Sequence, residues 1–337
     1  MHLRLAQEQR EEMILSPLAS KSGKSRGRRV LVEECDVRTV YQRDRDRLIH
    51  SKAFRRLKHK TQVFIAPSGD HYRTRLTHTL EVSQVARTAS RALLLNEDLT
   101  EAIALGHDLG HTPFGHAGEE ALAGLLPGGF KHNEQSLRVV DILEGEKGLN
   151  LTFEVRDGIL NHTGSGVPIT LEGQLVKICD RISYINHDID DALRAGIIKY
   201  EELPADEIQL LGRNGSERLN TMIRDLIENS WGKHRISMST ELGQAMENLR
   251  NFLFTYVYIG SVAKKEDDKA KRVIEMLYNF WLQHPEKLPP SVGPGKQEDG
   301  PERTVCDYIA GMTDHYILSL YQDIFLPNPW KEGARGS

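Results

Sequence analysis

Apolar residues recur along most of the chain at the spacing of one helical face. Between residues 76 and 95 they occupy positions 76, 80, 82, 85, 86, 89 and 93, and this period predicts a helix that carries His78. Residues 100–108 predict a second helix, with Thr100 as its N-cap and Glu101 in its first turn. Strand-like alternation is scarce, and a small hairpin is expected only at 164–169. The pattern predicts an all-α fold.

Two segments interrupt the helical pattern. Residues 1–30 include a basic run at 18–29 without any apolar period, and we expect a mobile N-terminal arm there. A solvated arm and a contact to phosphate or nucleic acid both agree with that composition. Proline and glycine forbid a continuous helix in the loop near 288–301, which we also expect to be mobile. Since the chain shows no repeat and no domain boundary, residues 31–337 are predicted to form a single helical domain.

An adjacent His-Asp pair, His107-Asp108, follows the second predicted helix. Such a pair offers one nitrogen and one oxygen ligand to a hard divalent ion. His78 on the first helix and Asp180, at the end of the apolar stretch 175–180, are candidates for two further ligands, because a buried ionised Asp needs a partner. Ordinary polar contacts in the core are the alternative interpretation of these four residues.

Further acid/base groups follow the His-Asp pair in a turn that Gly110 favours. Two of them, His111 and His116, are imidazoles. If a helix restarts after this turn, His116 and Glu119 lie three residues apart on one side and can form a hydrogen-bonded acid/base dyad. Alternatively, Glu119 only stabilises the helix start through the helix dipole. Acid/base groups beside an ion suggest hydrolysis.

Composition narrows the class of protein. The 337 residues are 39% hydrophobic and 27% charged, as in a globular protein, and no apolar stretch reaches the length of a signal or membrane segment. The net charge of −4 gives no overall attraction to nucleic acid or to an acidic membrane, so a nucleic-acid partner stays open and a membrane partner is not expected. Cys35, Cys179 and Cys306 form no paired motif, which argues against disulfides and thiolate metal sites and favours a reducing cytoplasm.

Several ordered motifs between about residues 43 and 325 resemble those of one family. They are 45–51 (RDRLIHS), 53–57 (AFRRL), 60–64 (KTQVF), 75–82 (RLTHTLEV), 107–120, 132–136 (HNEQS), 180–184 (DRISY) and 311–314 (GMTD). The chain resembles the HD-domain deoxynucleoside triphosphate triphosphohydrolases, in particular the bacterial dGTPase-like proteins. The resemblance implies an HD-domain helical fold with peripheral helices. It also implies one divalent metal ion per chain, held by His78, His107, Asp108 and Asp180. This mixed set of nitrogen and oxygen ligands suits Mn, Fe, Mg, Co, Ni or Zn.

The resemblance also implies roles for other residues. It places catalytic roles at His116, Glu119, His132 and Glu134. It implies substrate contacts from Gln62, Arg75, His111, Arg181, Tyr184 and Asp188. The cationic members of this set would bind a triphosphate, which carries roughly four negative charges. Gln62 and Asp188 match the residues that contact the sugar in the family. Tyr256 and Tyr258 are candidates for a tyrosine that packs under the sugar. Plain surface or core positions are the alternative for each of these residues.

The predicted reaction is metal-dependent hydrolysis of a dNTP, such as dGTP, to a deoxynucleoside and inorganic triphosphate. An HD-family phosphodiesterase or 5′-nucleotidase has the same four ligands and is the first alternative. A nucleotide-sensing protein without turnover is the second, although the intact ligand set weighs against it. The family resemblance further implies a homo-oligomer and a possible nucleotide activator, while composition favours a cytoplasmic location.

Overall fold

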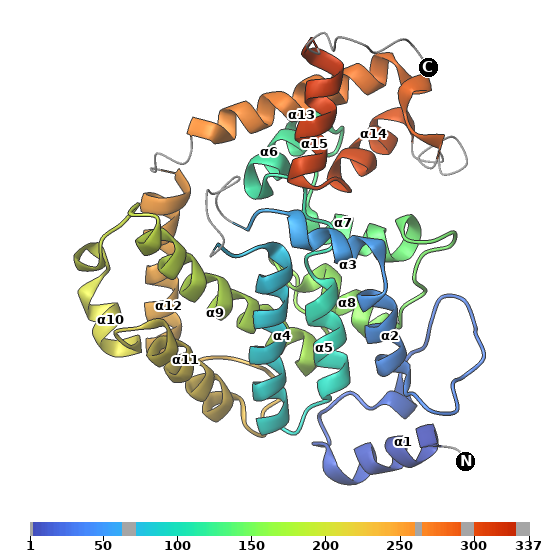
Figure 1. Ribbon diagram of the computed structural model, residues 1–337. Coiled ribbons are helices and arrows are strands. Elements are labelled where there is room, and N and C mark those ends of the chain that lie inside the picture. The colour runs from blue at the N-terminus through green and yellow to red at the C-terminus, as the bar shows by residue number, and fades with distance from the viewer. Residues whose placement is uncertain (1–2, 63–71, 260–264, 291–299, 328–337) are drawn as a thin grey trace, which may run out of the picture.

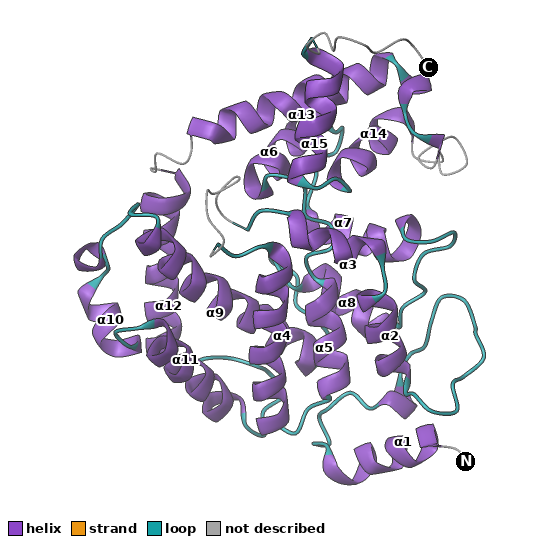
Figure 2. Cartoon of the chain, viewed as in Figure 1, coloured by secondary structure: helices purple, strands orange, loops and turns teal. Residues whose placement is uncertain are grey.

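The computed structural model describes residues 3–62, 72–259, 265–290 and 300–327. Within these ranges the chain forms fifteen α-helices and no strand. Figures 1 and 2 show their arrangement. The all-α prediction is confirmed, and the hairpin predicted at 164–169 is wrong. The carbonyl oxygens of Gly164 and Gly166 accept hydrogen bonds from Lys177 Nζ, and the Ile169 amide donates to Asp157 Oδ2. Side chains therefore satisfy the polar backbone groups that a hairpin would have paired.

Five helices form the centre of the molecule (Figure 1). They are α2 (Val40–Ile49), α4 (Arg75–Ala92), α5 (Glu97–Gly106), α8 (Phe153–Asn161) and α9 (Leu171–Arg194). Glycines allow α5 and α8 to approach closely, because a Cβ on Gly158 would lie 2.5 Å from the Ile103 side chain and one on Gly106 would lie 2.5 Å from that of Ile159. The large hydrophobic core lies between these helices.

The two helices that the periodicity predicts are present, with different starts. α4 begins after Thr74, whose side chain accepts a hydrogen bond from the Thr77 amide. α5 begins earlier than predicted, because its N-cap is Asn96 and not Thr100. Thr100 is buried inside the helix, where its hydroxyl donates to the Asn96 carbonyl at 2.9 Å. Both residue types cap helices and both residues are buried, but Asn96 has the extended backbone of a cap, and its side chain accepts from the Leu99 amide at 3.2 Å.

A second, smaller core lies at the C-terminal end of the chain, at the top of Figure 1. It is built by α6 (Gly115–Leu125), α13 (Lys265–Gln283), α14 (Gly300–Ala310) and α15 (Asp314–Phe325). α6 follows directly on the His-Asp segment, so this core is joined to the predicted site. Of the loop predicted near 288–301, residues 291–299 lie outside the described part of the chain.

The N-terminal segment lies at the other end of the molecule, with α1 (Leu3–Ile14) and the short helix η1 (Ser22–Lys24). Acidic side chains bind its backbone: Glu11 accepts from the Ser22 amide at 2.6 Å, and Glu154 accepts from the Arg26 amide at 2.7 Å. Arg28 forms an ion pair with the buried Asp44. Residues 3–30 thus contact the body of the protein, and the mobility expected of an arm at 1–30 stays a prediction, as does the single domain at 31–337.

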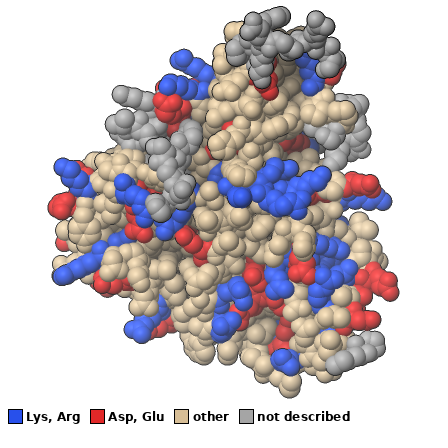
Figure 3. Space-filling view, viewed as in Figure 1, with Lys and Arg blue, Asp and Glu red and all other residues tan. Residues whose placement is uncertain are grey.

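The remaining α-helices surround this framework. They are α3 (Lys52–Arg56), α7 (His132–Arg138), α10 (Ala205–Leu211), α11 (Gly215–Ser230) and α12 (Thr240–Leu253). None of the helices in the described ranges has the length and apolar composition needed to cross a membrane. Lys and Arg side chains gather across the middle of the face in Figure 3, at the level of α3, and elsewhere on that face both signs of charge are interspersed.

Candidate active site

The loop after α5 carries the predicted His-Asp pair and lies directly against α7. Ser136 anchors it, since the Ser136 hydroxyl accepts from the Gly110 amide at 2.9 Å and donates to the His107 carbonyl at 2.6 Å. A Cβ on Gly110 would lie 2.1 Å from the Ser136 amide nitrogen, so only glycine fits there. The loop ends at Phe114, which is buried with a left-handed φ of 63°.

The four residues predicted as metal ligands converge from three different segments. α4 supplies His78, the loop supplies His107 and Asp108, and the middle of α9 supplies Asp180. His78 Nε2 lies 3.1 Å from Asp180 Oδ1 and 3.7 Å from Asp108 Oδ2. His107 Nε2 lies 3.4 Å from Asp108 Oδ1 and 3.7 Å from Asp180 Oδ1. Ligand atoms of His78, His107 and Asp108 all lie within 4.8 Å of one another. The side chains therefore face one small volume.

This volume fits a divalent cation. His107 Nδ1 contacts the Ala104 carbonyl at 2.6 Å, while its buried Nε2, on the side of the carboxylates, has no hydrogen-bond partner among the described residues. Burial lowers the pKa of His107, but Asp108 and Asp180 outweigh it and raise that pKa to about 9. The carboxylates thus favour positive charge beside His107 Nε2. A set of two imidazoles and two carboxylates suits a catalytic transition metal or Mg²⁺ with open positions.

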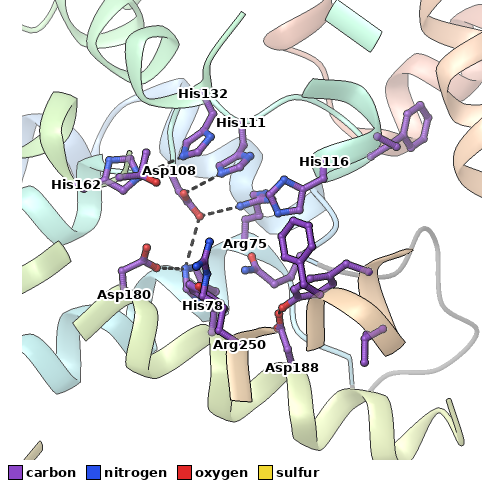
Figure 4. A pocket seen from close by; sticks show the side chains of 18 of the residues that line it. Arg75, His78, Asp108, His111, His116, His132, His162, Asp180, Asp188 and Arg250 are labelled. Atoms are coloured by element: carbon purple, nitrogen blue, oxygen red, sulfur yellow. Dashed lines mark hydrogen bonds and ion pairs between the residues drawn. The ribbon is translucent and has the colours of Figure 1, made fainter. Parts of the chain in front are cut away.

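Asp108 lies at the centre of the polar cluster, as the dashed lines in Figure 4 show. Beyond its neighbours in the ligand set, it accepts from Arg75 Nη1 at 3.0 Å, and its Oδ1 lies 3.2 Å from His111 Nε2. Burial raises the pKa of Asp108, but His107, His111 and Arg75 lower it well below the usual range, so the carboxylate is ionised. Its Oδ2 faces Arg75 and His78, and its Oδ1 faces His107 and His111.

Three more imidazoles line one side of this cluster. His111 and His132 stack with ring centroids 4.0 Å apart, and His132 Nε2 lies 3.3 Å from His162 Nε2. Burial lowers the pKa of His162 to about 3 and that of His111 well below its usual range, so both are neutral. Asp108, His111 and His132 also place ligand atoms within 4.8 Å of one another. His162 Nδ1 lies 2.7 Å from the Ile159 carbonyl, so the single proton of this neutral ring is held there and its Nε2 is an acceptor.

Glu119 on α6 is hydrogen-bonded to His132, whereas the sequence predicted His116 as its partner. Its Oε1 accepts from His132 Nδ1 at 3.0 Å and from the His132 amide at 2.8 Å. His116 Nδ1 lies 3.9 Å from Glu119 Oε2, beyond hydrogen-bonding distance. The spacing of three residues does put His116 and Glu119 on one side of α6, but the start of α7 approaches the carboxylate more closely.

The cluster forms the floor of a cavity of about 210 Å³ (Figure 4). Most of the predicted substrate contacts line it, together with residues that the sequence did not single out. The lining residues include Gln62, Arg75, His78, Asp108, His111, His116, His132, His162, Asp180, Tyr184, Asp188, Arg250 and Tyr258. One cavity thus joins the metal-ligand set to cationic, imidazole and hydroxyl groups.

Comparison with known proteins agrees with this geometry. The pattern of the HD domain matches residues 75–185, and that of a phosphohydrolase-associated domain matches residues 236–323. A deoxyguanosinetriphosphate triphosphohydrolase-like protein of Caldanaerobacter subterraneus is 61% identical over 333 residues, which cover 98% of each chain. The chain belongs to the HD-domain family of dGTPase-like phosphohydrolases.

Other members and one solved structure extend the comparison. The dGTPase-like protein of Clostridium tetani is 48% identical over 339 residues, 97% of each chain. A phosphohydrolase structure from Bacteroides thetaiotaomicron has a TM-score of 0.55 at 17% identity and covers 83% of this chain and 68% of its own, so it shares the fold. These comparisons confirm the recognised family and the all-α HD-domain fold.

Four residues predicted for the site do not line the cavity of this HD-domain phosphohydrolase: His107 and Glu119, which contact the lining residues Asp108 and His132, and Glu134 and Arg181. Glu134 is exposed on α7 and pairs with Lys131 at 2.8 Å. It is two positions from His132, which puts the two side chains on opposite sides of the helix. Arg181 is 38% exposed and lies 3.8 Å from Glu247. It follows Asp180 directly, so the helical turn points it about 100° away from the ligand.

Three residues at the site of the phosphohydrolase were not predicted from the sequence. His162 follows α8, His187 lies on α9 and Arg250 lies on α12, and no local motif marks any of them. Helix packing brings them to the site. Only His187 could have been found from the sequence. It lies seven residues after Asp180, and this spacing puts two side chains on the same face of a helix.

Proposed function

We propose that the chain is a metal-dependent dNTP triphosphohydrolase. The substrate is cleaved at the α-phosphorus and yields a deoxynucleoside and inorganic triphosphate. One observation carries this proposal: a single cavity is lined by three of the four candidate cation ligands, His78, Asp108 and Asp180, and by polar groups suited to phosphate and sugar. The names of the curated relatives, which refer to deoxyguanosine triphosphate, support the same substrate class.

One wall of the cavity suits a polyphosphate. Arg75 is 3% exposed and faces the cluster, and Arg250 lies beside Tyr184 at the cavity edge. Burial raises the pKa of Tyr184 to about 12, so its hydroxyl keeps its proton and donates at neutral pH. These donors would bind phosphate oxygens, which are acceptors only.

Another wall suits a sugar. Gln62 Oε1 is buried and has no hydrogen-bond partner within the described ranges, so it is available as an acceptor for a sugar hydroxyl. Asp188 accepts a hydrogen bond from the Tyr258 hydroxyl, and both residues line the cavity. Of the two tyrosines that the sequence suggested, Tyr258 is therefore the candidate for packing under the sugar. Tyr256 is 57% exposed and does not line the cavity.

The residues of the chain divide the chemistry among them. His78, His107, Asp108 and Asp180 would hold a divalent ion, which would supply Lewis-acid polarisation of a phosphate oxygen and a lower pKa for a bound water. Arg75 holds negative charge beside Asp108 as the α-phosphorus is attacked. His116, whose side chain is 70% exposed and lines the cavity, donates a proton to the 5′-oxygen of the departing deoxynucleoside. Glu119 orients His132, which stacks on His111.

Chromatography of the products tests the reaction. The full chain, loaded in turn with Mn²⁺, Mg²⁺, Co²⁺ and Zn²⁺, is incubated with a panel of dNTPs, NTPs and dNMPs. We expect deoxynucleoside and triphosphate as first products from at least one dNTP. First release of dNMP with pyrophosphate, or turnover of dNMP alone, would contradict the proposal and favour a pyrophosphohydrolase or a nucleotidase.

Metal stoichiometry tests the alternative. We propose one divalent ion per chain, and elemental analysis should find one. Two ions would favour the phosphodiesterase alternative, for which Asp108, His111 and His132 supply a second group of ligand-type atoms. A homo-oligomer, a nucleotide activator and a cytoplasmic location stay predictions from the family resemblance and the composition.

A further inference from the structure

A chain of buried polar contacts runs from the cavity wall to a metal ligand. His78 Nδ1 and His187 Nε2 lie 2.7 Å apart, at hydrogen-bonding distance. The other ring nitrogen, His187 Nδ1, lies 2.6 Å from Asp188 Oδ1, a close charge contact in which neither atom has hydrogen-bond geometry. Asp188 in turn accepts from the Tyr258 hydroxyl through its second oxygen. All four groups are buried or line the cavity, so water does not compete freely for these contacts.

The helix α9 sets this arrangement. Asp180 and His187 lie two turns apart on one face of α9, which packs against α4, the helix that carries His78. His78 therefore meets one α9 residue at each ring nitrogen: Asp180 lies 3.1 Å from Nε2, and His187 lies 2.7 Å from Nδ1. The imidazole is held from both sides.

We propose that His187 is a positioning residue for the metal ligand His78 and that Asp188 acts through it. A metal-bound His78 Nε2 has no proton, so its Nδ1 carries one and needs an acceptor. His187 Nε2 is the only atom at that distance among the described contacts. Its lone pair is available when the His187 proton is on Nδ1, facing Asp188. Such carboxylate–histidine contacts fix ring orientation and raise ligand basicity.

The inference rests on the proposed metal site and extends it to the sugar wall. Asp188 then has two roles, because one oxygen faces His187 and the other accepts from Tyr258. A residue that contacts only a sugar would leave the affinity for a metal unchanged. A residue that acts through His187 would change metal affinity in the absence of any nucleotide. Metal binding alone therefore separates the two roles.

The experiment measures Mn²⁺ affinity of the full chain by competition with a chelating dye, without nucleotide. His187→Leu removes the acceptor but keeps an apolar side chain in the space, and we expect affinity about 10- to 100-fold weaker than wild type. His187→Gln can present an amide oxygen to His78 Nδ1, and we expect most of the affinity to return. Circular dichroism and thermal midpoints show whether each variant is folded.

Two further variants on α9 form a matched pair. Asp188→Asn keeps the shape but removes the charge that faces His187, and we expect about tenfold weaker Mn²⁺ binding. Asp191→Asn is the comparison, because Asp191 is equally buried on the same helix and also interacts with the charge of His187, but its carboxylate pairs with Arg73 at 2.9 Å. Its affinity should fall less than that of Asp188→Asn. This pair keeps the inference testable if His187→Leu does not fold.

The results separate the inference from the proposed function. Wild-type affinity in His187→Leu, or equal losses in His187→Gln and His187→Leu, overturns the positioning role even if dNTPs are hydrolysed. Equal effects of Asp188→Asn and Asp191→Asn overturn the part played by Asp188. If the variants keep the expected order of Mn²⁺ affinities but wild type hydrolyses no dNTP, the proposed function fails and the inference stands.

Discussion

Asp314 ties the C-terminal helices to the loop of the metal site, and its removal should loosen that loop. Asp314 is 6% exposed at the start of α15. Its carboxylate accepts from the amides of Thr61 and Phe114, both at 3.0 Å, and from the Thr61 hydroxyl. Lys60 reinforces the link, since its Nζ donates to the carbonyls of His111 and Ala310. Residues some 250 positions apart in the chain thus hold the loop together.

The size of the effect follows from the contacts at Phe114. Its left-handed φ of 63° costs about 1–3 kcal/mol for a residue other than glycine, and the surrounding structure must sustain it. Asp314→Ala removes the charged acceptor and leaves the buried Phe114 amide unsatisfied. A hydrogen bond to a charged group contributes about 1.5–3 kcal/mol. Local opening near Phe114 should therefore become roughly 10- to 150-fold more frequent.

Hydrogen–deuterium exchange of peptides covering 107–118 measures this opening. Exchange in these peptides should accelerate in Asp314→Ala while peptides from α2 exchange as in wild type. Thr313→Ala is the matched control: it removes the N-cap bond to the Tyr316 amide at 3.3 Å and should loosen only α15, by about 1 kcal/mol. If Asp314→Ala accelerates exchange in α15 alone, the loop does not depend on Asp314 and the reasoning is refuted.

Four further predictions concern the site. Asp108→Ala should lose the bound ion and all turnover, and retained metal with normal activity would exclude the ligand set. Arg75→Ala should lower kcat/KM for a dNTP about a hundredfold at saturating metal, as expected when about 2–3 kcal/mol of charge-assisted contact is lost; wild-type kinetics would remove Arg75 from the phosphate contacts. His116→Ala should lower kcat by ~10²- to 10⁴-fold with little change in KM, and an unchanged kcat would assign the proton transfer elsewhere. Burial lowers the pKa of Lys60 from 10.5 to about 7, so between these pH values the unfolded chain binds a proton that the folded chain does not, and the free energy of unfolding rises with pH. The urea midpoint of wild type should therefore rise relative to that of Lys60→Met from pH 7 to 10. Parallel curves for the two proteins would contradict this prediction.

The helical framework could be predicted because its signal is local. A 3.6-residue period and the cap-type residues at Thr74 and Asn96 lie within single helices. The exact cap of α5 could not be chosen, because Asn96 and Thr100 are both good cap residues and only the backbone conformation, extended at Asn96, distinguishes them. The turns at 164–169 could not be predicted either, since Lys177 supplies donors to their carbonyls from a different helix.

The site could be predicted where chemistry and sequence neighbourhood coincide. His107 and Asp108 are adjacent, and the resemblance to a family supplied the more distant His78 and Asp180. The pairing of Glu119 with His132 could not be found from spacing, because it depends on how closely α7 approaches α6. The same holds for His162, His187 and Arg250, which reach the site only through helix packing. Basic composition at 18–29 predicted an arm, yet Glu11 and Glu154 bind the backbone of this segment.

The charges around the cavity bear on how the proposed triphosphate substrate would bind. The lining residues include two arginines and four aspartates, so their formal charge is −2 when the histidines are neutral. They are Arg75, Arg250, Asp108, Asp180, Asp188 and Asp267. A divalent cation only neutralises this set, so a triphosphate of about four negative charges meets no large excess of positive charge. Its binding then depends on directed donors. Arg75, Arg250 and the Tyr184 hydroxyl supply such donors, and the neutral tyrosine does so without the desolvation cost of a further buried charge.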